Sequence, residues 1–273
     1  MSVQAPPLAP AALPPVPVRG TVAEAWRLLR QYPRLVLLPM YAVQVPVALV
    51  SAVVTLLLYF TVFANEPVMS PADLIDGGAS GPLFAFLAMT AFEGLFAQVA
   101  RGATITGVAA AANNRPETLP RLLDPAFSKM GGLLVLVLVQ FAILMFGAVT
   151  IVGLPFALYA LLRLDLSIEA YLLENTRPMG ALRRSWVILK GSLWRFLGAM
   201  FLSALLVVIP FVAISSLTAL VFGGRTAQLV TIAVTTLVQA ILVVPLLAFF
   251  TAVTTLFYLR VKVRHDARLA ARI

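Results

Sequence analysis

Long apolar runs, rather than alternating apolar and polar positions, dominate the chain. The apolar stretches are 35–63, 82–111, 131–162, 196–222 and 226–259, and they are largely free of charged residues. About 20 apolar residues in a helix cross the roughly 30 Å of hydrocarbon in a bilayer. Strands of a membrane barrel would alternate every second residue, whereas Leu133 to Phe146 is apolar at every position except Gln140. Because backbone groups in lipid must bond one another, the pattern predicts an all-α, polytopic transmembrane helical bundle.

The third stretch decides the number of spans. Basic residues in short loops stay cytoplasmic, and they precede the first stretch, occupy 112–130 and 176–195, and follow the last stretch. Residues 64–80 carry only acidic charges. Both termini are therefore predicted inside, with an even number of crossings between 130 and 176. A turn from Gly147 to Pro155 gives six spans, and one continuous helix over 131–172 would give five.

The same pattern divides the chain into three parts. Residues 1–19 are proline-rich and predict a disordered tail, with a proline-rich ligand for a partner as the alternative. Residues 20–264 form a single helical membrane domain, and residues 265–273 form a basic cytoplasmic tail. The predicted spans lie near 35–63, 82–111, 130–149, 154–174, 196–222 and 226–259, with the short connection Gly223-Gly224-Arg225 outside.

Two amphipathic segments are predicted as helices at the cytoplasmic interface. The first starts with the capping-box pattern Thr21-Val22-Ala23-Glu24 and carries Val22, Trp26 and Leu29 on one face. The second follows Pro178, and its apolar face holds Met179, Leu182, Trp186, Leu189 and Leu193. Ala25-Trp26-x-x-Leu29-Arg30 is similar to Ser185-Trp186-x-x-Leu189-Lys190, through either an internal repeat or chance.

Composition narrows the chemistry. The 273 residues are 61% hydrophobic and only 11% charged, too apolar for a water-soluble domain. The chain has no cysteine and a single histidine, His265, and it contains no Ser/His/Asp arrangement, phosphate loop or metal-ligand cluster. We expect no catalytic residues, no metal, no cofactor and no enzyme activity. The net charge of +9 is spread over separate loops, which favours the bilayer with its anionic headgroups as partner over nucleic acid; protein partners are not predicted.

Polar residues inside spans are the first candidates for function, because each is unfavourable in lipid unless it is paired or hydrated. They are Glu93, Gln98 and Arg101 in the second span, and Arg163, Asp165 and Glu169 in the fourth. Either they form a polar site between spans two and four for a headgroup, an ion or a proton, or they form a structural ion-pair network.

A second group of candidates lies in the basic amphipathic segment. Its members are Arg183, Arg184, Trp186, Lys190, Trp194 and Arg195. Basic side chains beside tryptophans suit an anionic-lipid site at the headgroup level. Ordinary positive-inside topology explains the same charges without a specific lipid.

The run from Leu173 to Arg195 resembles the glycerophosphoryl diester phosphodiesterase membrane-domain family of bacteria. That family has a glutamate, a short linker, Ala-Leu-x-Arg-Ser-Trp, a basic residue with glycine, and Trp-Arg, which here read Glu174, Ala181 to Trp186, Lys190-Gly191 and Trp194-Arg195. Phe257 to Arg264 is similar to the tyrosine and spaced basic residues that close the family pattern, and Arg163-Leu164 stands where the family has an Arg-Leu pair. The resemblance covers about residues 20–265, and its distinctive part is about forty residues.

The resemblance implies a helical module of the bacterial cytoplasmic (inner) membrane. In fused family members the phosphodiesterase activity belongs to a separate soluble barrel domain, for which this chain has no room. The expected function is therefore that of a non-enzymatic membrane module with a lipid-organising or scaffolding role. The alternative is a small transporter or permease-like component that uses the polar site between spans two and four.

Overall fold

The computed structural model describes residues 17–58, 80–149, 153–222 and 228–270, and these residues form helices with no strand among them. In chain order the helices are α1 (Val18–Gln31), α2 (Pro33–Val36), α3 (Leu38–Leu58), α5 (Ser80–Ala112), α6 (Leu119–Ser128), α7 (Met130–Ala148), α8 (Gly153–Leu164), α9 (Ser167–Leu173), α10 (Pro178–Ile188), α11 (Leu193–Phe222) and α12 (Gln228–Ala270). The all-helical class predicted from the apolar runs is confirmed.

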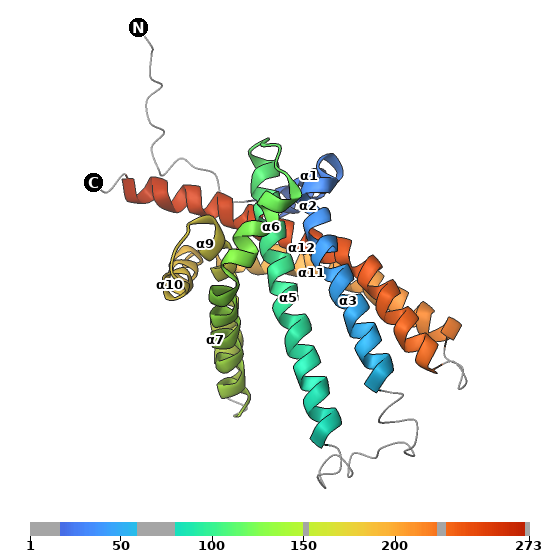
Figure 1. The fold of residues 1–273 in the computed structure, drawn as a ribbon. Helices are drawn as coiled ribbons and strands as arrows, with labels where there is room; N and C mark the ends of the chain where they lie inside the picture. The colour runs from blue at the N-terminus through green and yellow to red at the C-terminus, as the bar shows by residue number, and fades with distance from the viewer. Residues whose placement is uncertain (1–16, 59–79, 150–152, 223–227, 271–273) are drawn as a thin grey trace.

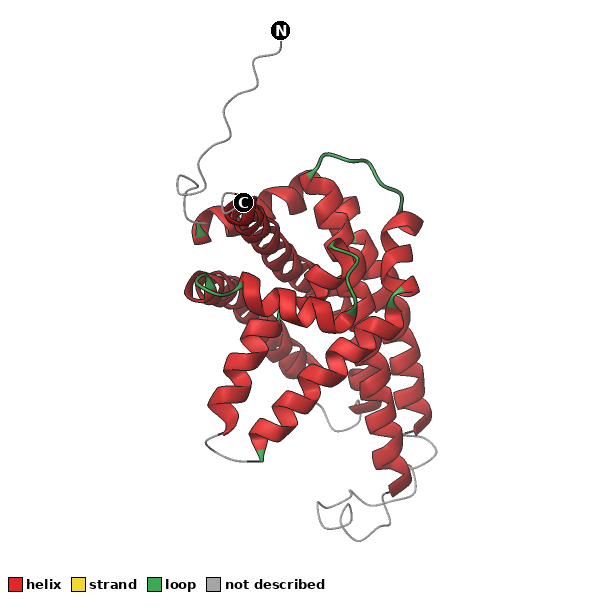
Figure 2. Ribbon diagram, turned by 90° about the vertical axis from the view of Figure 1, so that its left-hand side faces the viewer, coloured by secondary structure: helices red, strands yellow, loops and turns green. Residues whose placement is uncertain are grey.

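Three pairs of long helices that are consecutive in the chain pack side by side. They are α3 with α5, α7 with α8, and α11 with α12. The short helices α6 and α9, together with α1 and α2, gather at one end of the molecule, from which the long helices spread apart (Figures 1 and 2). The C-terminal part of α12 also lies at this end (Figure 1).

Several of the described helices are suited to cross a membrane. Three helical stretches are long and apolar enough, namely Ala88–Ala112, Met130–Gly147 and Val243–Ala267. A fourth is obtained if α10 and α11, which meet at a bend of 100°, are taken as one broken span, and Leu38–Val54 is a shorter apolar helix. The chain is therefore a helical protein of the membrane-associated type.

The stretch 131–172 is not one continuous helix. Helix α7 ends at Ala148, and α8 begins at Gly153 and packs back against α7. The two helices approach so closely that a Cβ added at Gly147 would overlap the side chain of Ala157, a contact that small residues permit. Of the predicted connections, residues 150–152 of this turn, residues 64–79 and the 223–225 turn lie outside the described residues, as do residues 1–16 of the N-terminal tail.

Three predicted boundaries are corrected. The segment predicted as one span over 154–174 is divided by a turn at Asp165-Leu166 into α8 and α9. Helix α12 continues to Ala270, so most of the predicted basic tail is helical. Helix α1 begins at Val18, with Pro17 as its extended N-cap residue, so Thr21 is not the cap and lies inside the helix, where its hydroxyl donates to the Pro17 carbonyl (2.9 Å).

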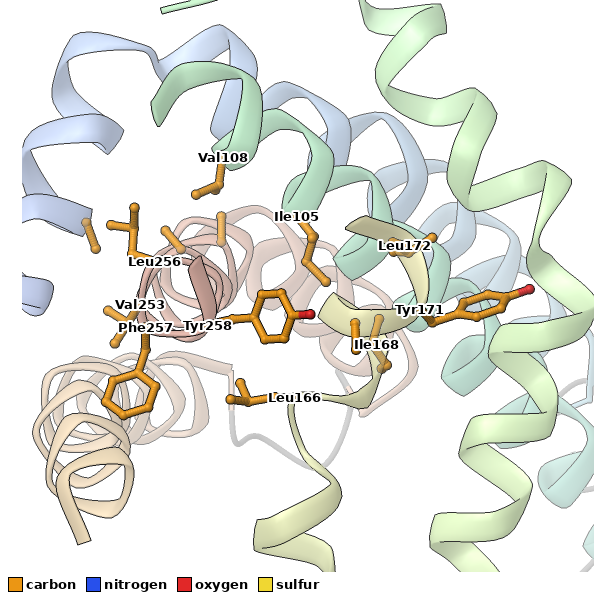
Figure 3. Packing of buried hydrophobic residues seen from close by; sticks show 14 of the residues in the cluster. Ile105, Val108, Leu166, Ile168, Tyr171, Leu172, Val253, Leu256, Phe257 and Tyr258 are labelled. Carbon is orange, nitrogen blue, oxygen red and sulfur yellow. The ribbon is translucent and has the colours of Figure 1, made fainter. Parts of the chain in front are cut away.

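A buried core surrounds α9, which packs against α10, α5 and α7 and is joined to α12 by the hydrogen bond between Glu169 and Thr254. Figure 3 shows Ile168 of α9, Ile105 of α5 and Tyr258 of α12 in this core, and all three are buried. Helices α7, α8 and α11 instead leave large apolar side chains exposed, such as Phe146 (82% exposed) and Phe201 (73%). An apolar surface of this kind is typical of contact with a bilayer.

Candidate functional site

The break between α8 and α9 is where polar side chains from several helices converge. The last carbonyls of a helix have no partner within it, and here three consecutive ones accept hydrogen bonds from side chains of three other helices. The donors are Ser185 of α10 (2.7 Å, to Arg163), Gln140 of α7 (3.2 Å, to Leu164) and Arg101 of α5 (3.3 Å, to Asp165). The broken backbone is therefore stabilised in the interior of the bundle, where unpaired carbonyls would be unfavourable.

Arg101, Asp165 and Glu169 form an ion cluster at this break, which we call the buried cluster. The Arg101 guanidinium lies 3.1 Å from a Glu169 carboxylate oxygen and 3.7 Å from an Asp165 carboxylate oxygen. Thr254 of α12 donates its hydroxyl to the same Glu169 oxygen at 2.9 Å. Glu169 is fully buried. The cluster thus ties α5, α9 and α12 together at the turn that ends α8.

The charges of the buried cluster do not balance. With all three groups ionised, one guanidinium faces two carboxylates, which leaves a net charge of −1. The second oxygen of Glu169 is buried and has no hydrogen-bond partner in the described part of the chain; the Asp165 oxygen that faces Arg101 at 3.7 Å is also buried and makes no hydrogen bond there. Such oxygens can accept a proton or a small cation. Among the described residues no group of three or more acidic or histidine side chains is placed to hold a metal ion.

The other predicted intramembrane residues stand apart from this cluster. Glu93 is exposed on α5 and accepts a hydrogen bond from Ser51 of α3. It precedes Arg101 by eight residues, which is about 12 Å along a helix. Gln98 has a buried side-chain oxygen without a hydrogen-bond partner in the residues described. Arg163 makes no ion pair there and instead lies between two aromatic rings.

A second carboxylate, Glu174, forms a cluster with α10 and α12, which we call the corner cluster. Arg184 lies 3.1 Å from it, Lys262 lies 3.4 Å from it, and the Tyr258 hydroxyl donates to it at 2.5 Å. Arg184 also pairs with Asp266 at 2.7 Å. Burial alone would raise the pKa of the Glu174 carboxyl, but the Tyr258 hydrogen bond and the charges of Arg184 and Lys262 outweigh it and hold that pKa below its ordinary value.

The predicted headgroup residues divide into two sets. Arg184 is bound by the corner cluster, so its guanidinium is occupied by protein partners. Arg183, Lys190 and Arg195 are exposed, and none has an ion-pair partner within the described ranges. The tryptophans of the set, Trp186 and Trp194, are 40% and 85% exposed.

Residues 189–192, which we call the elbow, connect α10 to α11 at the 100° bend. Gly191 has a φ of 86°, in the left-handed region that favours glycine. A small cleft of about 60 Å³ opens beside the elbow, and its polar lining consists of Lys190, Ser192, Arg195, Arg264 and His265. The bend therefore places a basic cleft next to the exposed Trp194.

Only part of the predicted apolar face of helix α10 contacts the protein. It buries Ala181, Leu182, Ser185 and Ile188, whereas Met179 is 62% exposed. Helix α1 buries Thr21, Val22, Ala25 and Leu28 and leaves Trp26 47% exposed. In both helices small side chains are among those that contact the bundle, where they allow close approach. Ala25 and Ser185 are both buried and both tryptophans half exposed, as the sequence similarity between the two segments would require.

Sequence reasoning missed several partners of these clusters. Thr254, Asp266 and Tyr159 carry no sequence signal that separates them from similar residues nearby. Gln140 had one, because it is the single polar residue in a long apolar run. Tyr258 belongs to the closing element of the resemblance, and with Glu174 and Arg184 it brings three residues of that pattern into one cluster.

Comparisons of the chain with models of known protein families, with characterised proteins and with solved structures found no match. The resemblance to the glycerophosphoryl diester phosphodiesterase membrane-domain family therefore stays a prediction.

Proposed function

We propose that the chain is a non-enzymatic module of the bacterial cytoplasmic membrane that binds and organises anionic lipids at its inner surface. The observation that carries the proposal is the elbow. Lys190 of the elbow, Arg183 of α10 and Arg195 of α11, which together we call the elbow charges, are exposed without ion-pair partners in the described residues, and the same segment carries the half-exposed Trp186 and the exposed Trp194. Basic side chains attract anionic headgroups of the inner leaflet, and tryptophan favours the headgroup level. The proposal agrees with the resemblance to the membrane-domain family, which implies a membrane module that lacks the catalytic domain.

The proposed topology has six spans with both termini inside. It is supported by the three packed helix pairs and by the position of α1, α6, α9 and the end of α12 at one end of the molecule (Figure 1). Helix α8 has 12 residues, about 18 Å of helix, so it reaches the inner surface only together with α9.

A reporter fused after Val149 tests this topology. Six spans require Val149 to be outside and Asn175 to be inside. A cytoplasmic signal from a fusion after Val149 would rule the six-span arrangement out.

The lipid-binding proposal predicts that the elbow charges concentrate anionic lipid around the protein. We expect purified protein extracted from mixed vesicles to carry an excess of phosphatidylglycerol over phosphatidylcholine. The triple variant Arg183→Gln, Lys190→Gln, Arg195→Gln should lose most of that excess. Mass spectrometry of the copurified lipids measures it.

The matched control removes the same charge elsewhere on the predicted inner surface, with Arg34→Gln, Arg115→Gln and Arg121→Gln. These arginines are also exposed. The control should keep the excess of phosphatidylglycerol. An equal loss in both triple variants would mean that the elbow charges serve topology alone.

The buried cluster favours a second candidate function, that of a small transporter or permease-like component. The supporting observation is the unpartnered oxygen of Glu169 in a cluster with an excess negative charge. Proton or sodium flux into proteoliposomes tests it, with Glu169→Gln as the variant and Glu174→Gln as the control. Flux equal to that of protein-free vesicles would exclude transport of these ions.

A further inference from the structure

A groove runs between α8 and the first turns of α11. It has a volume of about 520 Å³, within the range of about 300–1,000 Å³ that is usual for small-molecule sites. The apolar side chains that line it are Pro155, Leu158, Leu162, Leu193, Trp194 and Leu197. Phe156 and Trp194, on the two helices that form the groove, are 71% and 85% exposed. The groove therefore opens on an exposed apolar surface.

Arg163 lies in the last turn of α8 and is the one charged side chain among the described residues that line this groove. Its guanidinium is 5.1 Å from the ring centre of Tyr159 and 5.0 Å from that of Trp186, and it donates to the Trp186 carbonyl at 3.4 Å. These contacts fix the position of the cation. They do not neutralise it.

Arg163 differs from the part-buried arginines Arg101 and Arg184. Arg101 and Arg184 each face two carboxylates. Arg163 faces none among the residues described, and its Nε is buried without a hydrogen-bond partner. The guanidinium is half-buried and its hydrogen bond to the Trp186 carbonyl is exposed, so an anion that enters the groove can reach it and supply the missing counter-charge. The site is therefore complementary to an anion that the protein itself does not provide.

The place of Arg163 decides the kind of anion. One end of the groove holds the guanidinium near the elbow, and the rest of its lining is apolar. A ligand that matches both parts has an anionic head and an apolar chain. Phosphate suits the head, because guanidinium binds phosphate oxygens through two parallel hydrogen bonds.

We propose that this groove holds one anionic phospholipid, with its phosphate on Arg163 and an acyl chain along α8 and α11. The inference rests on the proposed function, since it takes the elbow to lie at the level of the headgroups. It goes further in assigning a single bound lipid to one residue that sits apart from the basic elbow face.

Native mass spectrometry of protein released from nanodiscs with equal phosphatidylglycerol and phosphatidylcholine tests the proposal. We expect one phosphatidylglycerol to stay bound after the annular lipids are stripped. Arg163→Gln should lower the ratio of phosphatidylglycerol to phosphatidylcholine in this retained lipid by about tenfold. Arg163→Lys should lower it less, because lysine keeps the charge but cannot form the two parallel bonds.

A substitution that fills the groove provides a second, independent test of the proposal. Leu197→Trp places a larger side chain in the lining, so the retained lipid of either kind should be lost. A ratio unchanged in both Arg163 variants, or a retained lipid that survives Leu197→Trp, would overturn the proposal. If Arg163→Gln does not fold, Arg163→Lys and Leu197→Trp decide it alone.

The elbow variant separates this inference from the proposed function. Arg183→Gln, Lys190→Gln, Arg195→Gln should reduce the bulk excess of anionic lipid while the one retained lipid persists. Suppose that the elbow variant loses the bulk excess of anionic lipid, but the Arg163 variants do not change the retained lipid. The proposed function is then supported and the lipid site in the groove is contradicted. Suppose instead that the elbow variant keeps the bulk excess, while Arg163→Gln lowers the ratio of the two lipids in the retained fraction. The lipid site in the groove is then supported and the proposed function is contradicted.

Discussion

Two glutamates five residues apart have similar partners but different surroundings. Glu169 receives a hydroxyl from Thr254 and a guanidinium from Arg101; Glu174 receives a hydroxyl from Tyr258, one turn further along α12, and a guanidinium from Arg184. The Glu169 side chain is 0% exposed and belongs to a cluster with a net charge of −1.

The Glu174 side chain is 13% exposed, and its cluster balances two carboxylates against Arg184 and Lys262. Removing one member of a buried, unbalanced charge cluster lowers the free energy of unfolding strongly. Removing one member of a balanced cluster near water lowers it little. We therefore expect the stability of the bundle to depend on the buried cluster far more than on the corner cluster.

Removing Arg101, the one cation of the buried cluster, should lower the stability of the protein more than the other substitutions below. Arg101→Gln leaves two carboxylates without a counter-charge, and losing one partner of a buried pair costs about 3–5 kcal/mol. We expect a large drop in the melting temperature of the purified protein. The double variant Arg101→Gln, Glu169→Gln should recover part of this loss. An Arg101→Gln protein that melts like the wild type would contradict the comparison.

Deleting one hydroxyl from each cluster gives a closer test. Thr254→Val keeps the shape of the side chain and leaves the buried Glu169 oxygen with Arg101 alone. Hydrogen bonds to charged groups are worth about 1.5–3 kcal/mol. We expect a loss of stability in that range, measured by thermal unfolding in detergent.

Tyr258→Phe is the matching change at the corner. Glu174 keeps Arg184 and Lys262, so the loss should be about 0.5–1.5 kcal/mol, as for an ordinary hydrogen bond. Tyr258→Phe losing more stability than Thr254→Val would reverse the ranking of the two clusters.

The corner cluster should also make the stability of the protein depend on pH in the acidic range. The pKa of Glu174 is lower in the folded protein than its ordinary value of 4.5. Its contribution to stability is therefore complete above pH 4.5 and is lost as the pH falls through the lower, folded value. We expect wild type to melt above Glu174→Gln at neutral pH. That difference should shrink as the pH falls below 4.5, and a difference constant with pH would contradict the assignment.

The sequence predicted the helical class and most of the helix positions, because apolar runs without charge have few other solutions in a bilayer. It did not predict the break at Asp165-Leu166. Nothing local marks a turn there; the break exists because Ser185, Gln140 and Arg101, distant in sequence, satisfy the freed carbonyls.

The candidate site was predicted in part for the same reason. Charges in an apolar run are visible, so Arg101, Asp165 and Glu169 could be named. Their separation from Glu93 and Arg163 depends on helix rotation, which a sequence does not give. Which faces of α1 and α10 contact the bundle was also not predicted, since a bilayer accepts large apolar side chains on the outside and small ones can face the protein.

Replacing an aspartate by asparagine should change stability only slightly in either cluster. It should lower stability in the corner cluster but not in the buried cluster. Asp266 is 46% exposed, and Arg184 retains Glu174 when Asp266 is changed. Asp266→Asn should therefore lower stability by less than about 1 kcal/mol, as for a surface ion pair. Asp165→Asn removes one of two negative charges that face a single guanidinium, so it brings the buried cluster to neutrality. We expect its melting temperature to equal or exceed that of the wild type. If Asp165→Asn destabilises the protein more than Asp266→Asn does, the buried cluster is not overcharged, and the difference between the two clusters is one of burial alone.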